Sequence, residues 1–133
     1  MNIIGIDVSQ GESHATLITK EAEEIAFKFK HNKSGFQILN SYIKPGTIII
    51  FETTGVYSAQ LTTYLKNKKV KFYELNPLEA KLRMASLRRN KTDKNDSFKL
   101  ALLGKTQLAE IKNHCNKQSN SLYESLQILS LRY

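Results

Sequence analysis

Four acidic residues have the positions that a metal-dependent nuclease would need. Asp7 follows the apolar segment IIGI, and Glu52 follows the apolar run TIIIF. Asp93 and Asp96 lie within RRNKTDKND, a strongly basic stretch. Carboxylates that meet around a divalent cation, beside positive charges that could hold a phosphate backbone, suggest phosphodiester chemistry on nucleic acid.

Asp7 and Glu52 are expected at or near the carboxyl ends of two buried strands, which is where open α/β sheets place their ligands. If these strands are parallel neighbours, their axes lie about 5 Å apart. Two carboxylates so close repel each other, which raises a pKa or requires a cation. Mg²⁺ or Mn²⁺ takes oxygen ligands and would relieve this repulsion.

Asp93 and Asp96 are three residues apart, so on a helix they share one face and could be presented together to the strand pair. The cationic side chains around them could hold the phosphate under attack, the arginines through forked hydrogen bonds. These cations are Arg88, Arg89, Lys91 and Lys94.

Each acid also has a purely structural interpretation. Asp7 could end a strand and begin a turn, and Glu52 could be a favourable acid in the first turn of the next helix. Asp93 could be an N-cap with Asp96 in the first helical turn. The combination of all four with the basic stretch favours function. His14, His31, His114 and Cys115 lack ligand-like spacing, and residues 114–115 are expected in a polar connector.

The bulk properties indicate one domain and a polyanionic partner. The chain has 133 residues, enough for one domain with a core. Its formal net charge is +8. Residues 64–105 hold 12 basic and 4 acidic groups, a net of +8, whereas residues 1–63 hold 5 and 6. This distribution favours nucleic acid, although a solvated lysine-rich surface would have the same composition.

The remaining composition points to a cytoplasmic protein. Cys115 is the single cysteine, so no internal disulfide can form and a reducing compartment fits. No apolar stretch approaches the roughly 20 residues that span a bilayer, and the first residues do not resemble a signal peptide. No membrane association is expected.

Hydrophobic periodicity predicts alternating strands and helices after an initial run of strands. Strands are predicted at residues 2–8, 13–18, 23–30, 47–51 and 70–75. Helices are predicted at residues 34–43 with Ser34 as cap, 56–66, 76–87 opened by Asn76-Pro77, and 93–103 stopping near Gly104. After a connector, Leu122, Leu126 and Leu129 recur at helical spacing.

This order, β-β-β-α-β-α-β-α and then helices, predicts an antiparallel meander followed by parallel strands. The expected fold is α/β, a mixed five-stranded sheet flanked by helices. By analogy it is the ribonuclease H-like arrangement, with the first strand central and the fourth beside it.

Several motifs, in this order, resemble those of the DEDD transposases, an insertion-sequence family that includes the Piv-type DNA invertases. They are GIDVS at residues 5–9, FETTGVY at 51–57, Asn76-Pro77 and KTDKND at 91–96. The resemblance covers about residues 1–112. It implies a RuvC-like, ribonuclease H-like domain in which Asp7, Glu52, Asp93 and Asp96 bind Mg²⁺ or Mn²⁺. It also implies DNA recombination, guided in some family members by an RNA.

The sequence departs from the family pattern at two positions and in length. Gln10 stands where the family usually has lysine, and Ser97 where it usually has alanine. Family members also carry a C-terminal domain with a proposed serine nucleophile, which is expected to be missing here. Residues 1–112 are thus predicted to be the catalytic domain. Residues 113–133 are predicted to be an amphipathic helix that begins a linker or coiled coil and supports a dimer or higher homo-oligomer.

Three function classes remain open from the sequence. The first is the catalytic domain of a DNA transposase or invertase that performs metal-dependent cleavage and strand transfer. The second is a non-catalytic module that holds DNA or a guide RNA, with binding that weakens steeply with salt. The third is half of an actin-like or sugar-kinase ATPase, although residues 8–14 provide little of the expected phosphate loop.

Overall fold

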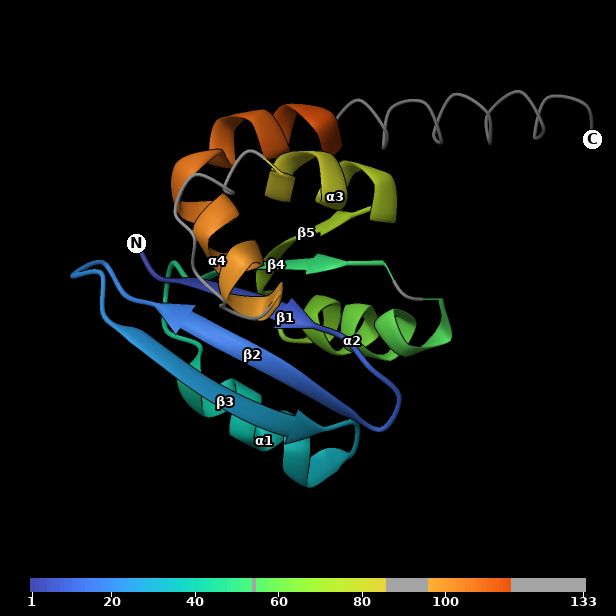
Figure 1. Cartoon of the computed structure of the whole chain (residues 1–133). Helices are drawn as coiled ribbons and strands as arrows, with labels where there is room; N and C mark the ends of the chain where they lie inside the picture. Colours follow the sequence, from blue (N-terminus) through green and yellow to red (C-terminus); the bar gives the residue numbers. More distant parts are fainter. Residues whose placement is uncertain (54, 86–95, 116–133) are drawn as a thin grey trace, which may run out of the picture.

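The computed structural model describes residues 1–53, 55–85 and 96–115. Its strands are β1 (Ile3–Asp7), β2 (Glu12–Ile18), β3 (Glu24–Lys30), β4 (Ile48–Glu52) and β5 (Lys71–Leu75). Its helices are α1 (Lys33–Tyr42), α2 (Val56–Asn67), α3 (Pro77–Ala85) and α4 (Asp96–Thr106). Residues 108–115 are also helical. The sheet lies between two layers of helices (Figure 1).

The five strands form one mixed sheet in the order β3-β2-β1-β4-β5. β1, β2 and β3 pair as an antiparallel meander, and β4 lies parallel to both β1 and β5. This arrangement confirms the predicted topology, with the first strand central and the fourth beside it. The two strands that carry Asp7 and Glu52 are therefore neighbours that run in the same direction.

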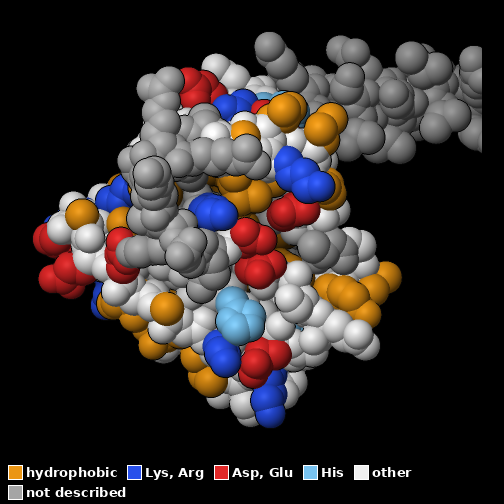
Figure 2. All heavy atoms as spheres, in the orientation of Figure 1, with side chains coloured by type: hydrophobic (Ala, Val, Ile, Leu, Met, Phe, Trp, Pro, Cys, Tyr) orange, Lys and Arg blue, Asp and Glu red, His pale blue; other side chains and the backbone are white. Residues whose placement is uncertain are grey.

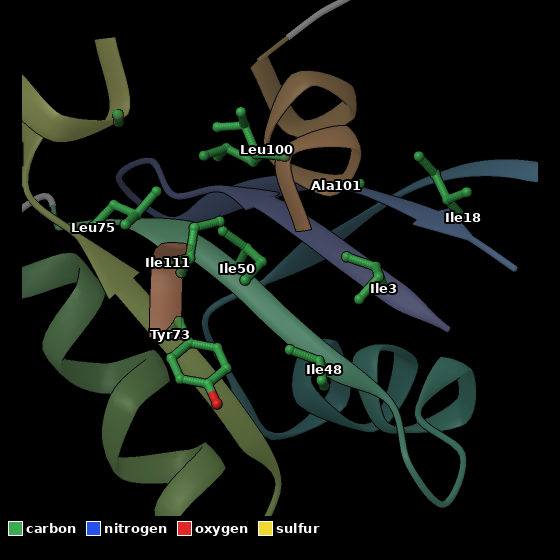
Figure 3. Close-up of a cluster of buried hydrophobic side chains, with 11 residues drawn as sticks. Ile3, Ile18, Ile48, Ile50, Tyr73, Leu75, Leu100, Ala101 and Ile111 are labelled. Carbon is green, nitrogen blue, oxygen red and sulfur yellow. The ribbon is translucent and has the colours of Figure 1, made fainter. Parts of the chain in front are cut away.

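The sheet buries apolar side chains on both faces, as the continuous apolar runs of β1 and β4 predict. Ile4 and Ile49 belong to the core that α1 and α2 cover, through Leu39 and Leu61 among others. Successive residues of a strand point to opposite faces, so Ile3, Ile50 and their neighbours form the second core. Figure 3 shows this second core, in which Leu100, Ala101 and Ile111 pack on the sheet.

Two glycines allow α4 to lie directly on the sheet. A Cβ at Gly5 would meet the backbone of α4, 2.2 Å from the carbonyl oxygen of Ser97. A Cβ at Gly104 would lie 2.6 Å from Cγ2 of Ile3. The prediction that the helix stops near Gly104 is wrong, because α4 continues to Thr106. Gly104 serves close packing and not a helix end.

The start of α1 also differs from the prediction. Asn32, and not Ser34, is the N-cap, and its Oδ1 accepts a 2.7 Å hydrogen bond from the backbone N–H of Gly35. A Cβ at Gly35 would lie only 1.8 Å from the carbonyl oxygen of Lys30. The helix thus begins against the end of β3, and Gly35 can be accommodated there only because it has no side chain.

Residues 108–115 are not the polar connector that the sequence suggested. They form a helix whose Ile111 is fully buried in the second core. Cys115 packs against the same core, and its Sγ donates to the carbonyl oxygen of Glu74 at 3.6 Å. His114 Nδ1 lies 3.9 Å from a carboxylate oxygen of Glu79. Leu108, Ile111 and Cys115 recur at helical spacing and pack together in this core, but so short a pattern does not by itself predict a helix.

Other predicted elements agree with the structure to within one or two residues where it describes them. Several predictions lie outside the described residues. They are the end of the third helix, the basic loop at 88–92, the stripe at Leu122, Leu126 and Leu129, and the part of the predicted 113–133 helix beyond residue 115. Across the described ranges, none of the helices has the length and apolar character needed to cross a membrane.

Candidate active site

Asp7 and Glu52 occupy the last positions of two adjacent parallel strands. The register pairs Ile6 with Phe51, so the next residue of each strand is one of the two acids. Ile6 and Phe51 both belong to the core under α1 and α2. Because side chains alternate along a strand, both carboxylates project from the opposite face, over which α4 packs. Figure 2 shows acidic side chains gathered over the ends of these strands.

α4 brings the third carboxylate to the same end of the sheet. Its first residue is Asp96. Ser97, one residue later, forms a buried 2.8 Å hydrogen bond with Thr16 of β2, between the two hydroxyl oxygens. Thr16 pairs with Gly5 in the β1–β2 register, so the first turn of α4 is fixed over the strand residue that lies two positions before Asp7.

The three acids influence one another electrostatically. Burial raises the pKa of the Asp7 carboxyl above its usual range, and the carboxylate of Asp96 raises that pKa further. Burial also raises the pKa of Glu52, and the carboxylates of Asp96 and Asp7 add to this increase. The carboxylate of Asp96 therefore disfavours ionisation of both strand acids, and a nearby positive charge would oppose this effect.

Two cationic or ionisable side chains that the sequence reasoning did not select belong to this site. His14 pairs with Asp7 across the β1–β2 hairpin and opposes the increase in the pKa of Asp7. Lys81 of α3 acts in the same way on the pKa of Glu52. The sequence could have indicated His14, because two strands joined by a short turn place residues 7 and 14 opposite each other. Nothing in the sequence indicates Lys81.

The remaining predicted site residues cannot be placed. Asp93 lies outside the described residues, and so do the proposed phosphate-binding residues Arg88, Arg89, Lys91 and Lys94. The described lysines of the basic segment do not gather in one place. Lys81 lies near the acids, whereas Lys66, Lys68, Lys69 and Lys71 lie where α2 ends and β5 begins, at the opposite edge of the sheet.

Glu74 is a nearby acid that does not belong to the cluster. It pairs with Phe51 in the β4–β5 register, so its side chain is on the other face of the sheet. Its carboxylate accepts hydrogen bonds from Thr53 Oγ1 at 2.6 Å and from Thr62 Oγ1 at 3.4 Å. Glu74 therefore provides a control residue, a carboxylate one strand away with a structural role.

The chemistry of the donor set fits a divalent metal ion. Carboxylate oxygens are hard ligands of the kind that Mg²⁺ and Mn²⁺ prefer. Burial, and then the negative charge of neighbouring carboxylates, raises the pKa values of Asp7 and Glu52, and a bound cation would oppose both effects. Within residues 1–53, 55–85 and 96–115, however, no three His, Cys, Asp or Glu side chains are disposed to hold one ion together. The described carboxylates share an electrostatic field but not a closed coordination shell.

Solved structures of DNA-junction resolvases are similar to this fold. RuvC of T. thermophilus, in complex with a Holliday junction substrate, has a TM-score of 0.52 and 12% identity, and the match covers 77% of this chain and 90% of RuvC. A Fowlpox virus resolvase, in complex with Holliday junction DNA, has a TM-score of 0.47 and 15% identity over 75% and 95% of the two chains. The RuvC match confirms the predicted ribonuclease H-like fold.

The sequence also matches a family. No curated protein is significantly similar to the chain. A family model described as a transposase, of the DEDD IS110 type, matches residues 4–133. This match includes β1, β4 and α4, the three elements that carry the described acids. The chain belongs to the DEDD transposase family.

Proposed function

We propose that this domain cleaves DNA phosphodiester bonds in a recombination reaction and uses a divalent cation held by Asp7, Glu52, Asp93 and Asp96. The observation that supports it most directly is the convergence of Asp7, Glu52 and Asp96. They come from two parallel strands and the start of a helix, and burial together with the charge of neighbouring carboxylates raises the pKa values of Asp7 and Glu52. Membership of a transposase family supports DNA as the substrate, rather than the nucleotide of an ATPase.

Some residues of the site would bind the cation, and others would contact the phosphate of the substrate. The carboxylates of Asp7, Glu52 and Asp96 would bind the cation, whose charge would stabilise the attacking and leaving oxygens of the phosphate. Lys81, beside Glu52, would give a phosphate oxygen a cationic hydrogen-bond donor. The amino terminus of α4 would add a partial positive charge at the same end of the sheet.

Magnesium titration by calorimetry tests the site directly. The unmodified chain should bind Mg²⁺ or Mn²⁺, and Asp7→Asn should abolish that binding event because it removes one of the clustered carboxylates. Glu74→Gln is the matched control, since it removes a carboxylate from the same sheet but from the other face. Equal binding by the unmodified chain and by Asp7→Asn would show that Asp7 is not a ligand.

A second candidate function is a nucleic-acid-binding module without catalysis. The observation in its favour is that the described carboxylates do not form a closed coordination shell. It predicts DNA affinity that falls steeply with salt and does not depend on magnesium. Affinity that rises with Mg²⁺ and loses this dependence in Asp7→Asn would exclude it.

Strand transfer, guidance by an RNA and assembly into a homo-oligomer extend the main proposal. Their support is the family membership and, for assembly, the apolar stripe in residues 113–133. A nuclease that performs recombination must join as well as cut, and joining requires two DNA ends held together, which a multimer provides. Sedimentation at high concentration tests the assembly, and a monomer at all concentrations would contradict it.

A further inference from the structure

A hollow lined by lysines lies at the edge of the sheet opposite the acids. It has a volume of about 500 Å³ and lies between the α1–β4 loop and the α2–β5 turn. Lys44 comes from the loop, and Lys68, Lys69 and Lys71 come from the turn and the start of β5. All four side chains are exposed, and no acidic residue lines the hollow.

This hollow is separate from the candidate active site. β4 and β5 are parallel, so Lys71 at the start of β5 pairs with Ile48, whereas Leu75 at its end pairs with Glu52. Ile48 and Leu75 mark these two ends in Figure 3. Four residue steps of about 3.3 Å separate the ends of the strand, roughly 13 Å. A phosphate bound by the lysines is therefore not the phosphate at the acidic cluster.

Aromatic rings hold two of the ammonium groups. The Nζ of Lys68 lies 6.0 Å from the centre of the Tyr64 ring, and the Nζ of Lys71 lies 5.6 Å from the centre of the Tyr73 ring. Such contacts favour particular rotamers of a long side chain. The charges of the turn are thus partly ordered before a ligand arrives, which reduces the entropy lost on binding.

Lys69 occupies a backbone position that favours glycine. α2 ends in a Schellman motif, in which the N–H of Lys69 donates to the carbonyl oxygen of Lys66 at 3.1 Å and that of Val70 donates to Leu65 at 3.0 Å. Lys69 has a φ of 57°, in the left-handed region that glycine adopts without steric strain. Backbone geometry does not explain a lysine here. Substitution of Lys69 by glycine therefore removes its charge without straining the backbone.

Two ordinary structural roles account for only part of the cluster. A cation in the last turn of α2 complements the helix dipole, and Lys66 already provides one. A lysine on the edge strand β5 discourages edge-to-edge pairing, which fits Lys71. Neither role explains Lys44 or Lys69. Four like charges around one hollow repel each other, and a polyanion relieves that repulsion.

We propose that this lysine-lined hollow binds the phosphate backbone of DNA as a second contact surface, separate from the acidic site. The proposal rests on the proposed function in that DNA is the ligand. The surface would hold a DNA segment at the opposite edge of the sheet while another segment reaches the carboxylates. It would supply affinity without sequence preference, because ammonium groups contact only phosphates.

The test compares two double variants that lose the same charge. Lys68→Ala with Lys69→Gly removes two ammonium groups from the hollow, and Lys28→Ala with Lys30→Ala removes two exposed ones from β3. Affinity for a duplex DNA is measured by fluorescence anisotropy in EDTA at several salt concentrations, so that the acidic site contributes no metal-dependent binding. Thermal unfolding of each variant is measured in parallel.

Each lost phosphate contact reduces the slope of log K against log salt by about 0.9. We expect the hollow variant to lose about 1.8 from this slope and the β3 variant to lose much less. The affinity advantage of the unmodified chain over the hollow variant should shrink about tenfold between 50 and 200 mM salt. Lys69→Gly alone should weaken binding without lowering the Tm, because glycine suits its backbone.

Equal slopes for the two double variants would overturn the proposal. Affinity for a single-stranded RNA of the same length is measured as well, and a loss of affinity for this RNA alone would also overturn it. These failures are distinguishable from failure of the proposed function. A chain that binds Mg²⁺ through Asp7 and shows equal slopes retains the active site and lacks the lysine surface. A chain that binds no DNA at any salt concentration, in EDTA and in Mg²⁺ alike, refutes both.

Discussion

Substitution of Gly5 tests whether close contact between α4 and β1 is what places Asp96 near the strand carboxylates. An alanine Cβ at position 5 would lie 2.2 Å from the carbonyl oxygen of Ser97 and 2.3 Å from the backbone nitrogen of Ala101. Both atoms are backbone, so no rotamer change can remove the contact. Ordinary van der Waals contact begins at 3.4 Å, and α4 must therefore move away by about 1.2 Å at this point.

That displacement should affect stability and metal binding together. Overpacking in a well-packed core costs about 1–3 kcal/mol, which corresponds to roughly 4 °C in Tm for each kcal/mol in a domain of this size. Asp96 begins the displaced helix, and changes in the groups that position metal ligands commonly cost 10–100-fold in affinity. We expect Gly5→Ala to bind Mg²⁺ about 10–100-fold more weakly in calorimetry, and to melt at a lower temperature.

Gly104→Ala is the matched control on the same helix. Its Cβ would lie 2.6 Å from Cγ2 of Ile3 and 3.0 Å from Cγ1 of Ile50, which are side-chain atoms that can move. It lies two turns from Asp96, so magnesium affinity should stay within about twofold of the unmodified chain even where the Tm falls. A Gly5→Ala variant with unchanged affinity and unchanged Tm would refute the reasoning, and so would equal losses of affinity in both variants.

Two further predictions concern the acids and the hydrogen bond that fixes α4. In metal-free buffer, Asp7→Asn should raise the Tm at neutral pH. The folded-state pKa of Asp7 lies above its ordinary value of 3.8, so its stability cost appears as pH rises through that raised pKa and is absent below 3.8; a lower Tm at pH 7 would contradict this. Ser97→Ala should lower stability by about 1–2 kcal/mol because Thr16 loses its buried partner. Adding Thr16→Val should restore part of that loss in denaturant titration, and an additive double variant would show that the two hydroxyls are not coupled.

The sheet and the two strand acids could be predicted because the signals that place them are local. An apolar run long enough for one strand and ending in an acid, as before Asp7 and Glu52, identifies both the element and the end at which the side chain emerges. Antiparallel pairing of the first three strands follows from their short connections. The structure confirms the strand order and therefore the neighbourhood of the two acids.

The errors occur where a residue has its role through a contact distant in sequence. Gly104 has the appearance of a helix stop, and only the closeness of Ile3 shows why a glycine is needed inside a helix. Leu108, Ile111 and Cys115 recur at helical spacing, but the pattern is short, and the burial of Ile111 depends on the second core. Lys81 reaches the site because α3 packs beside α4. The roles of Gly104 and Lys81 leave no periodic pattern in the sequence.

Net charge was the least specific signal. The charge of residues 64–105 is +8, but this number does not say on which surface of the fold each basic side chain lies. Because β5 runs parallel to β4, the lysines around the start of β5 and Glu52 at the end of β4 lie at opposite edges of the sheet. The basic residues of one segment are thus spread over more than one surface, although they are continuous in the sequence.

α4 links the stability of the domain to its proposed chemistry. The same turn of helix that covers Gly5 and bonds to Thr16 begins with Asp96, so changes that loosen this contact should weaken folding and metal binding together. Substitutions of Asp7 and Glu52 should have a different effect. Their negative charges would bind a cation, but without a cation these charges lower the stability of the fold. Variants that loosen the contact of α4 should therefore lose both stability and metal binding. Variants that neutralise Asp7 or Glu52 should lose metal binding and gain stability. A set of variants that failed to separate into these two classes would mean that α4 positions no part of the site.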